Sequence, residues 1–453
     1  MSSTQSPELV EPRGAETHEL EDVQRKQPEV TPPQDAISVE DVPPNGGYGW
    51  AWGIFLAHYL ANSTFENATR LEYALIGGLS ISQALLCAPV VDLSDRYLGM
   101  KTTLFIGTLL LFAALFGSSY ATEIWHLFLS QGVAFGWGLG FTYIPATATL
   151  PQWFSTRRSL AMGIASSGAG LGGLAYNLVA GAIVQHMGIR WAYRILAFCG
   201  LAVNTVCSLL LKNRNKAIQP LQNAFNWREY GHIEVMLVVG WGVFTELGYI
   251  VLLYSLPNYA ISIGLTPSQG AVVGAMLSLG LGVGRPVIGW YSDSFGRINM
   301  ATLMTLLCGV LCLTLWVPAK SYGVLIAFAL TSGAVCGIFW GTITPVLAEA
   351  VGMKRLPSSF GVICLALVVP TTFAEPIALE IVTASGYLTA QVFVGCMFLL
   401  AGTSTWLLRM WKLNQVELKA AREREQLDEV GNTGAAVSSF WFSPRKLFQL
   451  GKV

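Results

Sequence analysis

Charged side chains are scarce in this sequence. Asp, Glu, Lys and Arg make up 12% of the 453 residues, whereas 53% of the residues are hydrophobic. The 27 basic and 27 acidic side chains balance, so no net charge attracts nucleic acid or an acidic partner. This composition disfavours a soluble domain and indicates that lipid is the main solvent of the folded chain.

Motifs of enzymes and of metal sites are missing as well. The chain contains no GxxxxGK[ST], HExxH or GxSxG, and the glycine-rich run 168–173 lacks the preceding strand of a dinucleotide loop. The eight cysteines include no CxxC pair and fall in apolar segments, where thiols behave as small apolar residues. We therefore expect no catalytic residue, cofactor, metal site or disulfide framework. The cysteines are Cys87, Cys199, Cys207, Cys308, Cys312, Cys336, Cys364 and Cys396.

Long apolar runs dominate what is present. A helix needs about 20 mostly apolar residues to cross the roughly 30 Å of hydrocarbon. Eleven segments satisfy this criterion and a shorter one precedes them, so the sequence predicts an all-α polytopic membrane protein with about 12 transmembrane helices, the first of marginal length. The expected spans are 48–65, 73–91, 102–121, 124–146, 160–184, 194–211, 233–255, 269–291, 300–318, 322–347, 359–381 and 387–408.

The basic residues of the connections predict the orientation. Short loops rich in Lys and Arg remain in the cytoplasm, and if the connection 92–101 is cytoplasmic, eleven such residues lie inside and four outside. Both termini are then cytoplasmic, provided that segment 46–65 crosses the membrane. The external first connection contains glycosylation sequons at Asn62 and Asn67. The inside residues are Arg96, Lys101, Arg157, Arg158, Lys212, Arg214, Lys216, Arg228, Arg297, Lys354 and Arg355; the outside residues are Arg70, Arg190, Arg194 and Lys320.

Polar segments divide the chain into domains. Residues 1–44 carry ten acidic and three basic side chains and no apolar run that suits a signal peptide, so we expect a disordered acidic cytoplasmic tail. A polar cytoplasmic linker, 213–232, separates two six-helix bundles at 46–212 and 233–411. A cytoplasmic tail follows at 412–453, in which 412–429 is either a short surface helix or simply solvated.

A loop motif recurs at equivalent places in the two halves. Each copy puts an aspartate at the cytoplasmic end of a helix, then a glycine turn and a basic residue. The aspartates can accept hydrogen bonds and pair with cations on neighbouring helices, and such contacts can latch one state of a moving protein. The expected gating residues are Asp95, Arg96, Gly99 and Lys101 in the first copy, Asp293, Gly296 and Arg297 in the second, and Arg157 and Arg158 in the basic loop before the fifth span.

This duplicated motif resembles the loop signature of the major facilitator superfamily. Two further segments, 43–50 (PPNGGYGW) and 151–168 (PQWFSTRRSLAMGIASSG), resemble signatures of the monocarboxylate transporter family, in the style of its fungal branch. The resemblance covers residues 43 to 411 and implies the major facilitator fold. The chain departs from the family pattern in the first span, where a stretch about as long as one helix is missing. Impaired transport is one interpretation of that loss.

Charged residues inside spans are costly and usually face a functional cavity. By resemblance, Arg285 matches the substrate-binding arginine of the family, and a guanidinium can bind a carboxylate in bidentate fashion; a structural pairing is the alternative. The acidic residue that animal members carry one turn earlier is Leu281 here. Glu246 and Glu375 are therefore the candidates for proton coupling, with a structural role as the alternative. Among the aromatic residues, Tyr143, Tyr254, Phe339 and Trp340 are the candidates for substrate contact; in a chain that is 11% aromatic, most such residues serve packing or anchor the protein at the membrane interface.

These features predict a secondary active transporter of a small organic solute that works by alternating access of the two bundles. A monocarboxylate-like substrate with H⁺ as a candidate coupling ion is the preferred interpretation, and the plasma membrane is preferred over an organelle. The alternatives are an exporter of a larger metabolite, a vitamin-type permease, and a non-transporting membrane sensor, scaffold or defective truncated variant. The predicted partners are the solute and the lipid bilayer; the sequence predicts no oligomeric state.

Overall fold

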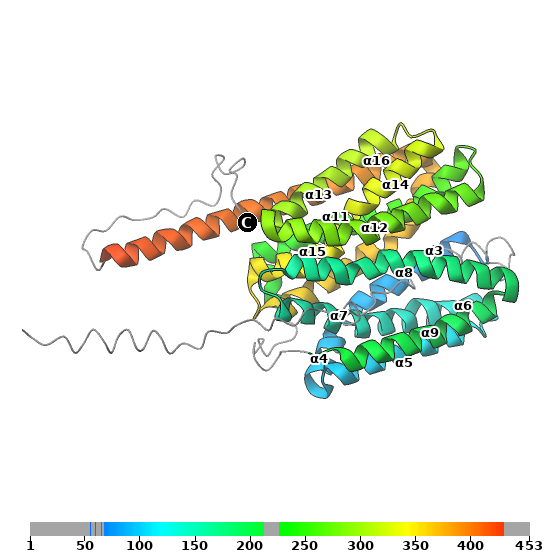
Figure 1. Cartoon of the computed structure of the whole chain (residues 1–453), viewed down its shortest axis with the longest axis horizontal. Coiled ribbons are helices and arrows are strands. Elements are labelled where there is room, and N and C mark those ends of the chain that lie inside the picture. Colours follow the sequence, from blue (N-terminus) through cyan, green and yellow to red (C-terminus); the bar gives the residue numbers. More distant parts are fainter. Residues whose placement is uncertain (1–54, 56–58, 60–64, 66–67, 213–225, 430–453) are drawn as a thin grey trace, which may run out of the picture. The chain divides into compact units, whose positions relative to one another are not determined.

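The computed structural model describes Phe55, Tyr59, Phe65 and residues 68–212 and 226–429. The chain divides into two units, 1–40 and 41–453, and all described residues belong to the second. These residues form helices joined by short turns, with no strand in the described ranges (Figure 1). The predicted all-α class is therefore confirmed. Asn62 and Asn67 lie outside the described residues.

The first half contains paired helices separated by brief connections. α3 and α4 meet at a bend of 44°, and α6, η2 and α7 follow one another without a break, η2 being a π-helical turn. The bounds are α3 Arg70–Leu86, α4 Ala88–Leu98, α5 Met100–Ser118, α6 Ile124–Leu127, η2 Phe128–Ala134, α7 Phe135–Trp153, α8 Arg158–Met187 and α9 Ile189–Leu210.

The second half begins with a short 3₁₀ helix and ends with a very long helix. α16 consists of two helices that meet at Gly386, whose φ of 80° and ψ of 175° are not helical, and the second of them runs on to Glu429 (Figure 1, orange to red). The bounds are η3 Trp227–Gly231, α11 Ile233–Ser262, α12 Pro267–Phe295, α13 Arg297–Leu311, η4 Cys312–Trp316, α14 Tyr322–Cys336, α15 Ile338–Val351 and α16 Leu356–Glu429. The segment 412–429 is thus helical and continuous with the last expected span.

Local sequence explains where several helices begin. α12 starts with a capping box, because the Thr266 hydroxyl accepts from the backbone N–H of Gln269 and the Gln269 side chain accepts from that of Thr266. Gly99 and Gly296 stand at the same point of the repeated loop motif with φ values of 83° and 108°. Only glycine adopts this backbone conformation at no steric cost, so both copies of the motif form the predicted tight reversal.

Seven helical stretches of the described residues are long and apolar enough to cross a bilayer, and the bent pair α3–α4 makes an eighth. In this total α13 counts together with η4, and α14 together with α15. α16 counts once in this total although it covers both of the last two expected spans. α11 runs on to Ser262, beyond the expected end of its span at residue 255. The spans predicted from apolar runs therefore correspond to helices wherever the structure describes them.

Helices of the same half pack together, and two helix pairs join the halves. α5 packs on α7 and α9, and α11 packs on α16. The halves meet where α8 runs beside α12 and where α3 runs beside α16 (Figure 1). A Cβ at Gly170 would lie 2.6 Å from the Ser278 carbonyl oxygen and collide with Gly282. Small residues therefore bring the α8 and α12 backbones into direct contact.

Two residues of the expected first span pack into the first half of the chain. Phe55 and Tyr59 have helical backbone and are buried. The ring of Phe55 lies 4.2 Å from that of Tyr193 on α9, and the Tyr59 and Tyr193 hydroxyls are 3.3 Å apart. The Tyr59 ring also stacks on Tyr73 of α3 at 5.9 Å. These contacts attach the described part of this segment to α3 and α9.

Candidate functional site

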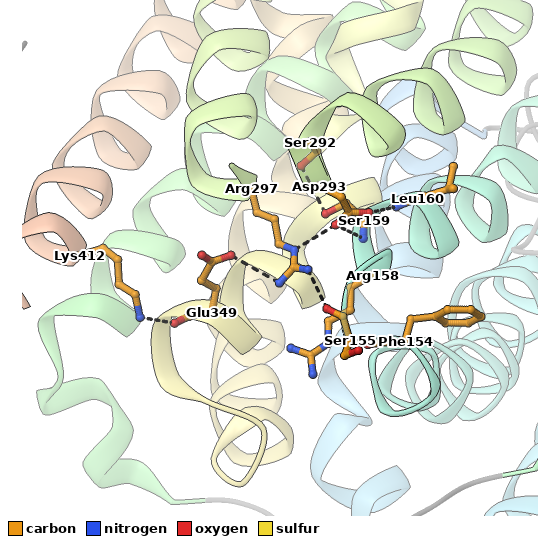
Figure 2. Close-up of polar contacts among 10 residues, drawn as sticks. All are labelled: Phe154, Ser155, Arg158, Ser159, Leu160, Ser292, Asp293, Arg297, Glu349 and Lys412. Atoms are coloured by element: carbon orange, nitrogen blue, oxygen red, sulfur yellow. Dashed lines mark hydrogen bonds and ion pairs between the residues drawn. The ribbon is translucent and has the colours of Figure 1, made fainter. Parts of the chain in front are cut away.

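A polar cluster joins the halves at the end of the helices that the loop charges predict to be cytoplasmic (Figure 2). The Asp293 carboxylate, at the end of α12, accepts from the backbone N–H groups of Ser159 at 3.1 Å and Leu160 at 3.0 Å. The first N–H groups of a helix lack partners within it and carry partial positive charge. A side chain of the second half therefore caps the start of α8 in the first half.

Arg297 extends this cluster to further segments. Its Nε donates to Asp293 at 3.2 Å, its Nη2 donates to the Ser155 carbonyl oxygen at 3.1 Å, and its Nη1 lies 3.6 Å from the Glu349 carboxylate. Lys412 donates to the Glu349 carbonyl oxygen, as Figure 2 shows. We call this cluster of Asp293, Arg297, Glu349, Lys412 and the α8 start the gate cluster. The second copy of the motif thus makes the interhelical contacts that the sequence predicted.

The other expected gating residues make contacts within the first half. Lys101 donates from Nζ to the Leu209 carbonyl oxygen at 3.1 Å, and Arg158 donates from Nε to the Phe154 carbonyl oxygen at 2.6 Å. Arg96 and Arg157 are exposed, and Asp95 is partly buried on α4. The two copies of the motif therefore share their glycine turn but differ in what they bind.

Deeper in the helices, Arg285 is buried on α12 with 4% of its surface exposed. Its Nη1 donates to the Ser166 carbonyl oxygen of α8 at 2.6 Å, and its Nε has no hydrogen-bond partner in the described part of the chain. A Cβ at Gly337 would lie 2.5 Å from Nη2 and 2.9 Å from Nε. The glycine between α14 and α15 therefore provides the space that the guanidinium occupies.

Glu246 is a buried carboxylate in the same region as this arginine. It is 1% exposed on α11, Trp340 of α15 is the side chain that offers it a hydrogen bond, and its Oε1 lacks a partner among the described residues. The charge of Arg285 acts on it, but within residues 68–212 and 226–429 the two form no direct ion pair. Arginine and glutamate thus lie in one region without neutralising each other by contact.

Aromatic side chains surround these two charges. Tyr143 of α7 packs edge-on against Trp340 with ring centroids 5.8 Å apart, and Phe339 contacts Trp340 at 5.1 Å. Tyr249 of α11 lies within hydrogen-bonding reach of Arg285 and also interacts with Glu246. The sequence did not single out Tyr249, although it stands three residues after Glu246 and so on the same face of a helix. We call Arg285, Glu246, Tyr143, Tyr249 and Trp340 the central cluster.

Two predicted site residues lie apart from the central cluster. Tyr254 and Glu375 pair with each other across α11 and α16. Phe339 is fully buried and its ring lies 4.8 Å from that of Trp241. Because it also contacts Trp340, it packs against the central cluster without belonging to it. In the described part of the chain, no group of three or more His, Cys, Asp or Glu residues is arranged to hold a metal ion.

Comparison with known proteins identifies the family. The profile of the Major Facilitator Superfamily matches residues 47–247 and 236–448. The chain belongs to this superfamily. Probable transporter MCH2 of Saccharomyces cerevisiae is 33% identical over 421 residues, which cover 87% of this chain and 88% of the yeast protein. Monocarboxylate transporter 12 of Mus musculus is 28% identical over 466 residues, which cover 85% of this chain and 95% of the mouse protein.

Solved structures agree on the fold. A double-tryptophan variant of the major facilitator protein XylE superposes with a TM-score of 0.67 at 13% identity, covering 82% of this chain and 94% of that chain. The major facilitator fold and the resemblance to the monocarboxylate transporter branch are therefore confirmed. The protein is a multi-pass membrane transporter for small molecules, and transport rather than catalysis is the activity of its class.

Proposed function

We propose that this major facilitator protein carries a small organic anion of the monocarboxylate type, and that Arg285 binds the carboxylate of the substrate. The buried guanidinium, whose Nε has no partner in the described residues, is the observation that carries the proposal. A buried polar group without a hydrogen bond costs about 1–3 kcal/mol, and more when it is charged. A carboxylate ligand removes that cost and neutralises the charge in the same step.

The surroundings of Arg285 suit a small substrate. Tyr143 and Trp340 are partly buried and face the same region from opposite halves of the chain. Aromatic side chains with one polar atom can pack on an apolar tail and still offer a hydrogen bond. These two residues therefore contact the apolar part of the substrate, while Arg285 binds its carboxylate.

Glu246 is the proposed site of proton coupling. Leu281 stands one turn before Arg285 and is fully buried, so this chain has no carboxylate at that position. Glu246 is buried beside the arginine instead, and its Oε1 has no partner among the described residues. A carboxyl group in an apolar environment gains from taking up a proton. Substrate anion and proton together leave the charge of the site unchanged, which suits symport.

The gate cluster supports alternating access as the mechanism. Its contacts close the predicted cytoplasmic end in this conformation, since Asp293 and Arg297 hold α8 and the loop before it. Release of substrate on that side requires these bonds to break while the bundles 46–212 and 233–411 rock around the central cluster. We place both termini in the cytoplasm and the protein in the plasma membrane.

Uptake by purified protein in liposomes tests the proposal. Radiolabelled lactate, pyruvate and acetate serve as probes under an inward proton gradient, with the variant Arg285→Lys beside the wild type. Lysine keeps the charge but loses the planar pair of donors. Hydrogen bonds to charged groups contribute about 1.5–3 kcal/mol, so we expect KM to rise by about one to two powers of ten.

Arg190→Lys is the matched control, because Arg190 is exposed at the start of α9 and takes no part in the site. Its uptake should equal that of the wild type. Anion uptake that is equally fast in Arg285→Lys would refute the assignment of the carboxylate. Absence of uptake of every probe by the wild type would refute a monocarboxylate-type substrate.

A further inference from the structure

A second carboxylate, Glu375 on α16, is buried away from the central cluster. It is 5% exposed, and its Oε2 has no hydrogen-bond partner among the described residues. The side chain beside it that can hydrogen-bond is Tyr254 of α11. An ionised carboxylate with a free oxygen is costly in such a place, whereas a protonated carboxyl group is neutral. The proposed function leaves this pair without a role.

The position of the pair along the helices places it on the external side of the central cluster. Arg285 lies ten residues before the cytoplasmic end of α12, and Glu246 lies thirteen residues after the cytoplasmic start of α11. At about 1.5 Å per residue, these are depths of about 15 Å and 20 Å. Glu375 lies nineteen residues into α16 and Tyr254 twenty-one residues into α11, which correspond to about 28 Å and 32 Å.

Few charged groups surround Glu375. α11 contributes Tyr254, whose hydroxyl lies within hydrogen-bonding reach of the Glu375 carboxyl group. α3 packs on α16 where Gly78 meets Thr372, and the carboxylate in that part of α3, Glu72, is exposed and bound to Thr69. α13 packs on the part of α16 that follows Gly386, where Gly309 meets Gly395 and Leu399. Among the described residues no cation forms an ion pair with Glu375.

Polar side chains on α11 connect the pair to the central cluster. Tyr254 interacts with Glu375 and with Tyr249, and Tyr249 interacts with Glu246 and Arg285. Glu246 and Tyr249 share a face of α11, because residues three apart are neighbours, whereas Tyr254, five residues after Tyr249, lies about 140° further round the helix. The pair is therefore linked to the central cluster through the interaction of Tyr254 with Tyr249 and not through one continuous face of the helix.

We propose that Glu375 and Tyr254 form a second proton-binding site, placed between the external face and the central cluster. This inference rests on the proposed function for its role in coupling. A proton from the external solution forms an O–H bond with a carboxylate oxygen of Glu375 and gives a neutral carboxylic acid. This acid forms a hydrogen bond with the Tyr254 hydroxyl, as donor through its O–H or as acceptor through its C=O. Release of the proton restores the carboxylate, and no other bond changes.

Infrared difference spectroscopy on the full-length protein in lipid nanodiscs tests proton binding without any substrate. Titration from acidic to alkaline pH should reveal the C=O stretching band of a buried protonated carboxyl group that is absent in Glu375→Gln. In Tyr254→Phe the band should remain but shift in frequency and in titration midpoint, because only the hydroxyl is lost. Glu380→Gln is the matched control, since Glu380 lies on the same helix but is exposed, and it should retain the band unchanged. If Glu375→Gln retained every carboxyl C=O band of the wild type, the proposal would be overturned.

Transport in liposomes tests the role in coupling. Glu375→Gln should lose accumulation of lactate driven by a proton gradient by about tenfold or more, corresponding to about 1.4 kcal/mol, while exchange of labelled for unlabelled lactate continues. Loss of both activities in Glu375→Gln, with the infrared band unchanged, would mean a structural role. Normal accumulation in Glu375→Gln together with failure of Arg285→Lys would overturn this inference and leave the proposed function intact.

Discussion

The gate cluster is partly buried and the central cluster lies deeper among the helices, and the two differ in how completely their polar atoms are bonded. In the gate cluster both oxygens of Asp293 accept hydrogen bonds, and Arg297 reaches three acceptors. In the central cluster Arg285 Nε and Glu246 Oε1 have no partner among the described residues. Native proteins satisfy nearly all their buried polar groups, so the two clusters have different tasks.

A fully bonded network stabilises one arrangement of helices, and an incompletely bonded one accommodates something else. The gate cluster holds the start of α8 against the end of α12, which is a contact that must break when the opposite state forms. The central cluster keeps donors and acceptors that a bound anion and a proton can complete. The difference in bonding therefore separates a latch from a binding site without reference to any relative.

The largest effect is expected from breaking the latch with Asp293→Asn. The amide keeps the size of the side chain but loses the negative charge that Arg297 and the α8 N–H groups bind. Bonds of this type contribute about 1.5–3 kcal/mol, so the population with an open cytoplasmic end should rise by about ten- to a hundredfold. The measurement is the rate at which an impermeant thiol reagent labels Ser159→Cys from the cytoplasmic side, corrected for the native cysteines, because Ser159 is fully buried in this conformation.

Two controls define that experiment. Glu380→Gln removes an exposed carboxylate far along α16 from the gate cluster and should leave the labelling rate at the wild-type value. Arg297→Lys keeps the charge but not the fork of donors, and it should fall between the wild type and Asp293→Asn. Equal labelling rates in all four proteins would show that the gate cluster does not hold this conformation.

A smaller effect is expected from filling the space beside the binding arginine with Gly337→Ala. The backbone at Gly337 has φ −88°, so alanine fits the local conformation, but its methyl group would meet the Arg285 guanidinium at 2.5 Å. Overpacking of this kind costs about 1–3 kcal/mol, and the KM for lactate should rise by about five- to a hundredfold. Gly117→Ala is the control, since a Cβ at Gly117 meets nothing within 4 Å. An unchanged KM would show that Arg285 does not need its present position to bind substrate.

Much of the fold follows from local sequence. Apolar runs of sufficient length predict the helices, and the glycine of each repeated motif predicts the reversals at Gly99 and Gly296, because a positive φ is a property of single residues. Arg285 and Glu246 were recognisable for the same reason, since an ionisable residue within an apolar run stands out without knowledge of its neighbours. Both side chains are buried in the structure, and their roles stay predictions.

The partners of these residues were not predictable. The bond from Arg285 to the Ser166 carbonyl joins positions 119 residues apart, and those from Asp293 to α8 join positions more than 130 apart. Such pairings depend on the register in which α8 lies on α12, which glycine contacts along both helices set jointly. The same limit explains why Tyr249 was missed. Tyr249 belongs to the central cluster because α12 places Arg285 beside it, and the sequence around Tyr249 gives no sign of that contact.

The smallest effect is expected at a third polar group, where η3 meets the start of α16. Arg355 lies 2.6 Å from the Glu229 carboxylate, and the Ser359 hydroxyl donates to the same carboxylate at 2.9 Å. Burial alone would raise the pKa of Glu229, but these bonds and the Arg355 charge outweigh it and hold the pKa below its ordinary value. Because the folded protein binds this proton more weakly, the pair stabilises it above the unfolded pKa of about 4.3 and ceases to do so as pH falls through the lower folded value.

The variant Glu229→Gln should therefore melt at a lower temperature than the wild type at neutral pH, with a loss of about 1 kcal/mol in the free energy of unfolding. The difference should shrink as the pH falls from the unfolded pKa of about 4.3 through the lower folded pKa, below which the wild-type carboxylate is also neutral. Transport should change little, because this group lies wholly within the second half and does not join it to α8. If Glu229→Gln lost the same stability at neutral and at acidic pH, the effect would come from packing and not from charge. A large loss of transport would show that Glu229 also takes part in closing the cytoplasmic end.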